Sequence, residues 1–64
     1  MDAAIPITVE WMDSKHQMHA YSYSVHALPR KGDHVAINNE YFVVLAAVFR
    51  LDRETITILT ERTK

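Results

Sequence analysis

Apolar and polar side chains alternate along most of this chain, which is the pattern of β-strands with one buried face. Near the N-terminus every second side chain is large and apolar: Ile5, Ile7, Val9 and Trp11. We therefore predict a first strand over residues 7–12. The polar residues Asp13, Ser14 and Lys15 that follow are typical of a tight turn, so this strand should form a hairpin with the next one.

The segment from residue 17 to residue 26 is compatible with two structures. As a strand it carries its large side chains on one face: His19, Tyr21, Tyr23 and Val25. As a helix over residues 17–28 it brings together side chains at roughly helical spacing: Met18, Tyr21, Val25 and Leu28. Tyrosine loses rotamer freedom in a helix and serine competes there for backbone hydrogen bonds, so the alternation of tyrosines with serines favours the strand. We predict a second strand, with the helix as the alternative.

Turn residues precede and follow a short third strand. Pro29 ends the second element. Gly32, the only glycine, is expected to take a positive φ, and Asp33 beside it can accept backbone N–H bonds. Residues 34–37 alternate as a short strand, and the two asparagines after it tolerate the positive φ angles of a tight hairpin turn.

The strand predicted over residues 41–49 is apolar on both faces. Simple alternation assigns one face to Tyr41, Val43, Leu45, Ala47 and Phe49, and the other to Phe42, Val44, Ala46 and Val48. A single antiparallel sheet commonly leaves one face of each strand in water, so this strand must be covered by a curled sheet or by a second chain. A last strand is predicted over residues 55–60.

These elements predict an all-β fold: a small five-stranded antiparallel meander that forms an SH3-like or partly open barrel, as a single domain over residues 1–64. A chain of this length buries only about 60% of the surface that its unfolded form exposes. The absence of cysteine excludes disulfides and thiolate zinc sites, so self-association becomes the leading additional source of stability. We predict a homodimer, formed through a free sheet edge or through the fourth strand, whose candidate contact residues are Tyr41, Phe42, Val44 and Val48.

Charge and composition exclude several classes of partner. Seven basic and eight acidic residues give a net charge of −1 and are spread evenly, so the chain has no basic field for nucleic acid. The longest apolar run is too short to span a bilayer as a helix, and the N-terminal residues lack the basic region and apolar core of a signal peptide. We expect no membrane association and a cytoplasmic location.

Histidine is abundant, but its spacing does not indicate a site. Among the four histidines, His16 and His19 point to opposite faces of a strand, and no acidic or cysteine partner lies at a ligand spacing. We interpret them as solvated polar positions at turns and strand ends. Asp33 and His34 also face apart in a strand, and so small a domain can hardly enclose a catalytic pocket. We expect neither a metal, nor a cofactor, nor enzymatic activity.

Exposed aromatic and basic side chains are the best candidates for a binding surface. Tyr21 and Tyr23 are flanked by serines, and a tyrosine ring has a polar tip that tolerates water or a partner surface. Arg30 and Lys31 lie at a turn, where they could contact a carboxylate or a phosphate. We therefore predict a non-enzymatic protein-binding module that uses these side chains. A nucleic-acid-binding barrel that uses the same residues is the alternative, which the balanced charge disfavours.

The second half of the chain also resembles known sequences. The segment LPRKGDHV at residues 28–35, followed by YFVV at residues 41–44, resembles the LPRxGDxV…YxV pattern of short bacterial and phage-associated proteins of uncharacterised function. More loosely, it is similar to the glycine-aspartate hairpin of phage head-tail joining proteins, which have an SH3-like barrel. The resemblance spans residues 28–59 and implies no catalytic residue. It adds a further possibility, an accessory protein of a phage or mobile element that joins or inhibits a larger assembly.

Overall fold

The computed structural model describes residues 4–63 as a single sheet of β-strands. The strands are β1 (Ile5–Met12), β2 (Met18–Val25), β3 (His34–Ile37), β4 (Glu40–Arg50) and β5 (Thr55–Arg62). All five predicted strands are therefore confirmed to within two residues at each end, and the second of them is a strand rather than a helix. Between residues 4 and 63 there is no helix long and apolar enough to cross a bilayer.

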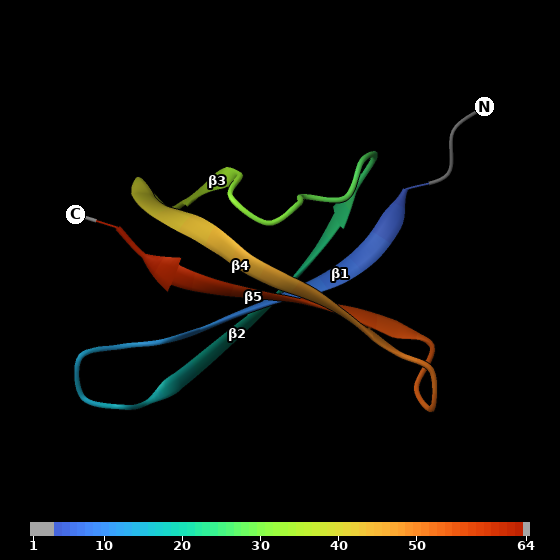
Figure 1. Ribbon diagram of the computed structural model, residues 1–64, viewed down its shortest axis with the longest axis horizontal. Helices are drawn as coiled ribbons and strands as arrows, with labels where there is room; N and C mark the ends of the chain where they lie inside the picture. The colour runs from blue at the N-terminus through green and yellow to red at the C-terminus, as the bar shows by residue number, and fades with distance from the viewer. Residues whose placement is uncertain (1–3, 64) are drawn as a thin grey trace.

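The order of the strands differs from that of a meander. Across the sheet the order is β2-β1-β5-β4-β3, with β1 and β5 parallel and the other neighbouring pairs antiparallel. The prediction of an all-β, curled and barrel-like sheet is confirmed, and the prediction of a fully antiparallel meander is wrong. In Figure 1 the β1–β2 hairpin and the β4–β5 hairpin run along opposite diagonals, as the twist of such a sheet requires.

The burial of the strands explains this order. β5 carries the fully buried Ile58, and its threonines Thr57 and Thr60, which point to opposite faces, are 3% and 5% exposed. A strand buried on both faces belongs at the centre of a sheet. β2 is exposed along most of its length and β3 has only 4 residues, so both suit an edge. Because β2, β3 and β4 lie between β1 and β5 in the chain, the connection is long enough for a parallel pair.

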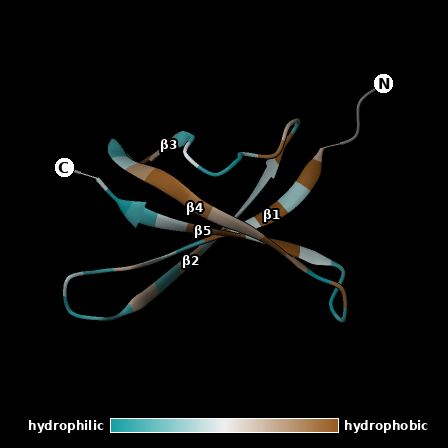
Figure 2. Cartoon of the chain, in the orientation of Figure 1, coloured by the Kyte–Doolittle hydropathy of each residue, from teal (hydrophilic) through white to brown (hydrophobic). Residues whose placement is uncertain are grey.

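The hydrophobic core lines the inner face of the curled sheet. Its buried members come from every strand except β2: Ile7, Val9, Ile37, Phe42, Val44 and Ile58. Figure 2 shows hydrophobic residues along most of β4 and in bands on β1, while the β1–β2 turn is hydrophilic. The alternation that the sequence predicts for β1 and β3 is therefore the alternation between this core and the outer face.

A β-bulge interrupts the pairing of β4 with β5. Val44 pairs with Thr60 and Ala46 pairs with Leu59, so Leu45 is an extra residue without a partner in β5. The extra residue shifts the alternation of side chains in β4 by one position.

The bulge changes which residues of β4 share a face. Behind it, Ala47 pairs with the core residue Ile58 and lies on the inner face, so Ala46 and Val48 lie on the outer face. Simple alternation groups Ala46 and Val48 with Phe42, and that prediction is wrong. In a strand that is apolar at nearly every position, no polar residue marks the point at which the alternation changes.

The turns have the predicted conformations. Asn38 and Asn39 have φ angles of 51° and 67°, and Gly32 has a φ of 93°. The carboxylate of Asp33 accepts a hydrogen bond of 2.8 Å from the backbone N–H of Arg30. The roles that the sequence assigns to these turn residues are therefore confirmed.

Candidate functional site

Four aromatic rings of β1 and β2 lie side by side on the inner face of the sheet. Trp11 stacks on His19 and on Tyr21, with ring centroids 5.3 and 5.0 Å apart, and Tyr23 follows Tyr21 at 6.5 Å. We call these side chains the aromatic row. The register of β1 with β2 produces it, because Trp11 is directly opposite His19, and residues opposite each other in an antiparallel pair share a face.

The aromatic row contacts the core through Trp11 and is open to solvent at Tyr21 and Tyr23. The ring of Trp11 packs against that of Phe42, which is 1% exposed, at a centroid distance of 4.6 Å. Tyr21 and Tyr23 are 41% and 40% exposed, because β2 is an edge strand and, among residues 4–63, no further strand lies beside it. The sheet thus holds large aromatic side chains in place and leaves them accessible, which is the arrangement that a binding surface requires.

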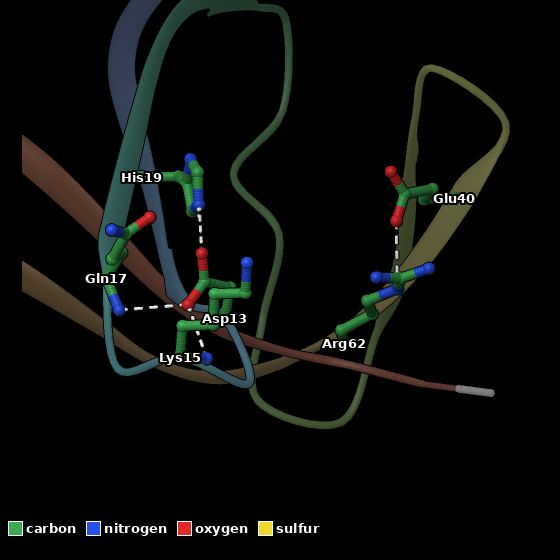
Figure 3. Close-up of polar contacts among 6 residues, drawn as sticks. All are labelled: Asp13, Lys15, Gln17, His19, Glu40 and Arg62. Atoms are coloured by element: carbon green, nitrogen blue, oxygen red, sulfur yellow. Dashed lines mark hydrogen bonds and ion pairs between the residues drawn. The ribbon is translucent and has the colours of Figure 1, made fainter.

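A polar cluster at the β1–β2 turn holds His19 in the row. One oxygen of the Asp13 carboxylate accepts the backbone N–H groups of Lys15 and Gln17 at 2.8 and 2.9 Å, and the other lies 2.8 Å from Nε2 of His19 (Figure 3). The hydrogen bonds from His19 and from the N–H of Gln17 hold the pKa of the Asp13 carboxyl below its ordinary value. The turn and the aromatic row therefore form one connected unit.

Figure 3 also shows an ion pair between strands β4 and β5. Nε of Arg62 lies 2.8 Å from a carboxylate oxygen of Glu40, and both side chains are largely in solvent. A pair as exposed as this one contributes little to stability. It ties the end of β5 to the start of β4 and takes no part in the aromatic row.

The histidines agree with the sequence analysis at all positions except one. His16, His26 and His34 are exposed, as expected for solvated polar positions. The side chain of His19 is 38% exposed and lies between Trp11 and Asp13. The described part of the chain contains no group of three or more histidine, aspartate or glutamate side chains that could hold a metal ion.

An apolar cleft lies between the two edges of the sheet. It has a volume of about 220 Å³, and its walls come from β1, β2, β3 and the segment that joins β2 to β3: Ile7, Val9, Tyr23, Ser24, Val25, Pro29, Val35, Ala36 and Ile37. Because β2 and β3 each pair on one side only, the sheet is a half-barrel rather than a closed barrel. Tyr23 belongs both to the aromatic row and to this cleft, so the two features are continuous.

The structure separates the predicted binding residues into two groups. Tyr21 and Tyr23 are neighbours in the aromatic row. Arg30 and Lys31 are exposed, and they line a different hollow, together with Phe49, to which neither tyrosine contributes. The basic pair and the tyrosines therefore do not form one surface.

The residues predicted for self-association are also divided, because they lie on opposite faces of β4. Phe42 and Val44 are each 1% exposed, so the core of their own chain occupies their side chains and removes them from the candidate interface. Tyr41 and Val48 are 61% and 36% exposed on the outer face, and Leu45 is 44% exposed. We call Tyr41, Leu45 and Val48 the outer patch.

No protein-family model, no curated protein and no solved structure matches this chain. The resemblance of residues 28–59 to phage-associated proteins therefore stays a prediction. The function has to be argued from the aromatic row, the apolar cleft and the free edges of the sheet.

Proposed function

We propose that this chain is a non-enzymatic protein-binding module. It binds an extended protein segment along the free edge of β2, and the side chains of that segment rest on the aromatic row. The observation that carries this proposal is an edge strand of 8 residues that pairs on one side only and carries two tyrosines that are about 40% exposed. An extended segment that joins a sheet edge gains affinity from main-chain hydrogen bonds and specificity from its side chains.

β2 is the less protected of the two edges. Natural sheets block their edges with short strands, with lysine or proline, or with bulges. β3 has only 4 residues, whereas β2 has 8 and contains no proline, lysine, arginine or glycine. Its pairing with β1 is continuous, without a register shift. The outer side of β2 therefore offers a regular row of backbone donors and acceptors to another strand.

The side chains beside this edge support binding to protein more than binding to nucleic acid. Tyrosine and tryptophan are enriched in protein interfaces, where they bury a large area at a low cost in rotamer entropy. Nucleic acid requires cations along its backbone. Arg30 and Lys31, the basic residues predicted for that role, line a different hollow from the tyrosines.

The test selects extended peptides from a random display library against the immobilised protein and measures their affinities by titration. In the double variant Tyr21→Ser, Tyr23→Ser the selected peptides should lose about tenfold or more in affinity, because two rings leave the surface that contacts them. The matched control is Tyr41→Ser, which removes an exposed tyrosine from the outer face. It should leave the affinity within about twofold of wild type.

Two outcomes would contradict the proposal. Selected peptides that bind the double variant and wild type equally would show that the site lies elsewhere. A screen that yields no peptide, combined with salt-sensitive binding of a single-stranded oligonucleotide that Arg30→Ala, Lys31→Ala abolishes, would assign the chain to the nucleic-acid-binding alternative.

A further inference from the structure

We infer that the segment bound at β2 is the β2 strand of a second copy of this chain. The two strands pair antiparallel about a twofold axis that passes between them at the level of Tyr21, so that two half-barrels share one continuous sheet. This inference rests on the proposed function, because it names the partner of the same edge. Three features of β2 support the inference: the direction of its backbone N–H and C=O groups, the small side chains of the residues that carry these groups, and the absence of charged side chains from the strand.

Hydrogen bonds at the β1–β2 turn determine which backbone groups of β2 face outward. The N–H of Asp13 donates to the carbonyl of Gln17 at 2.9 Å, and hydrogen-bonded and non-hydrogen-bonded pairs alternate along an antiparallel ladder. We extend this alternation along the register of the two strands. The odd-numbered residues of β2 are then hydrogen-bonded to β1, and the backbone N–H and C=O groups of the even-numbered residues point away from β1. The carbonyl of Glu10, opposite Ala20, accepts a 3.0 Å hydrogen bond from the side-chain hydroxyl of Thr60 in β5, so it points away from β2, in agreement with this alternation.

The residues of β2 whose backbone N–H and C=O groups point away from β1 do not obstruct another strand that approaches this edge. They are Met18, Ala20, Ser22 and Ser24, three of which have small side chains. In an antiparallel pair centred on Tyr21, Ala20 of one copy is opposite Ser22 of the other, and Met18 is opposite Ser24. Outward-facing residues then oppose each other throughout the pair, so their N–H and C=O groups can all be bonded across the axis.

The absence of charge on β2 favours a second copy over other occupants. A twofold axis brings the side chains in the middle of the strand near their own counterparts, so a charged side chain there would lie close to a like charge. β2 contains no aspartate, glutamate, lysine or arginine. Instead, Tyr21 meets Tyr21 on the inner face and His19 meets Tyr23, and aromatic pairs across strands are favourable. The exposed areas of both tyrosines become covered in the pair.

The outer patch is a weaker interface for a second copy. It lies on the convex side of the curled sheet, and two convex surfaces touch over a small area, whereas a stable face-to-face interface buries roughly 1,200 Å² or more. Glu61, which is exposed and directly opposite Val43 in the register of β4 with β5, places a carboxylate on that same face. Edge pairing depends on backbone hydrogen bonds more than on area, so β2 can form a dimer that the outer patch cannot.

The test combines the solution mass with amide hydrogen exchange. Light scattering over roughly 1 µM to 1 mM should show the mass rising from monomer to dimer. Over the same range, the N–H groups of Ala20, Ser22 and Ser24 should change from unprotected to protected, because they are free in the monomer and bonded in the dimer. A dimer through the outer patch would leave these three N–H groups unprotected.

Variants at Ser22 separate the edge from the rest of the fold. Ser22→Pro removes one outward N–H and no bond to β1, and Ser22→Lys places like charges near the axis, so each should raise the dissociation constant about tenfold or more. Ser22→Thr keeps the N–H and the neutral charge and should dimerise like wild type. Val48→Lys, in the outer patch, should also dimerise like wild type. Circular dichroism of every variant separates loss of pairing from loss of folding.

The outcomes distinguish this inference from the proposed function. A mass that stays monomeric up to about 1 mM, or a dimer that Val48→Lys disrupts and Ser22→Lys does not, would overturn the inference. If the chain stays monomeric while selected peptides still depend on Tyr21 and Tyr23, the inference fails and the proposed function survives. If the chain dimerises with protected edge amides and Ser22→Lys prevents it, the partner is the second copy.

Discussion

Val44 and Val48 lie on the same strand and provide a matched test of which face of β4 is the core. Val44 is 1% exposed and Val48 is 36% exposed, because the bulge at Leu45 puts the two side chains on opposite faces. Simple alternation would put them on the same face. We therefore expect Val44→Ala to destabilise the fold much more than Val48→Ala.

The size of the difference follows from what each substitution removes. The substitution of valine by alanine removes two methyl groups. At about 0.8 kcal/mol for each buried group, the lost free energy of transfer from water to the core at Val44 is roughly 1.6 kcal/mol. The cavity that remains in the core raises the total to about 2–3 kcal/mol. At Val48 part of the side chain is already in water and no closed cavity forms, so the loss should be under about 1 kcal/mol. A domain of 64 residues has a total stability of roughly 3–10 kcal/mol, so only the first variant loses a large part of it.

The assay uses the only tryptophan of the chain. The ring of Trp11 packs against Phe42 in the folded protein, so its fluorescence reports unfolding. Urea titrations at a protein concentration too low for self-association give the free energy of unfolding of wild type and both variants. Equal losses for the two variants, or a larger loss for Val48→Ala, would refute the assignment of the inner face and the bulge with it.

The turns and the Asp13 cluster provide three smaller tests by thermal or urea denaturation. Asn39→Ala should cost about 1 kcal/mol and Asn39→Gly should cost nothing, because this residue has a φ of 67°; equal stability of the two variants would contradict the turn. Gly32→Ala should also cost about 1 kcal/mol, through the backbone alone, since φ is 93° and no atom lies within 4 Å of the added Cβ; a much larger loss would indicate a clash that the structure does not contain. The lowered pKa of Asp13 adds stability above the pKa of an unfolded aspartate, and this contribution disappears as the pH falls through the folded pKa. Asp13→Asn should therefore reduce stability at neutral pH and flatten its decline in acid, and an unchanged acid profile would contradict that role.

The strands and turns of this fold could be predicted because their signals are local. A period of two, the asparagine pair at 38–39 and the single glycine each act within a few residues. The strand order could not be predicted in the same way, because the partner of a strand lies far away in the chain. The serines of β2 and the shortness of β3 indicate edges, but nothing in β1 or β5 specifies that they pair with each other in parallel.

Parts of the candidate site could also be predicted from the sequence. The alternation of Tyr21 and Tyr23 with Ser22 and Ser24 indicates one aromatic face and one polar face, which predicts exposed tyrosine rings. The stacking of His19 on Trp11 was missed, although the two residues are equally distant from Lys15 at the centre of the turn and are therefore opposite each other in a hairpin. The separation of Arg30 from the tyrosines depends on the path from β2 to β3, which no local pattern determines.

The apolar character of β4 predicts that either a curled sheet or a second chain covers that strand, and in the structure the curled sheet covers its inner face. The inner face of β4 is covered by its own chain through Phe42 and Val44, and its outer face keeps only a curved and interrupted patch. The larger number of unsatisfied hydrogen-bonding groups lies on β2. This long strand is one edge of the half-barrel, and its outward N–H and C=O groups have no partner in the sheet. Only another extended strand can both form hydrogen bonds with the unpaired backbone groups and cover the half-exposed tyrosine rings. A partner that docked on β4 would leave both unsatisfied, which is why the edge, and not the apolar face, is where binding should occur.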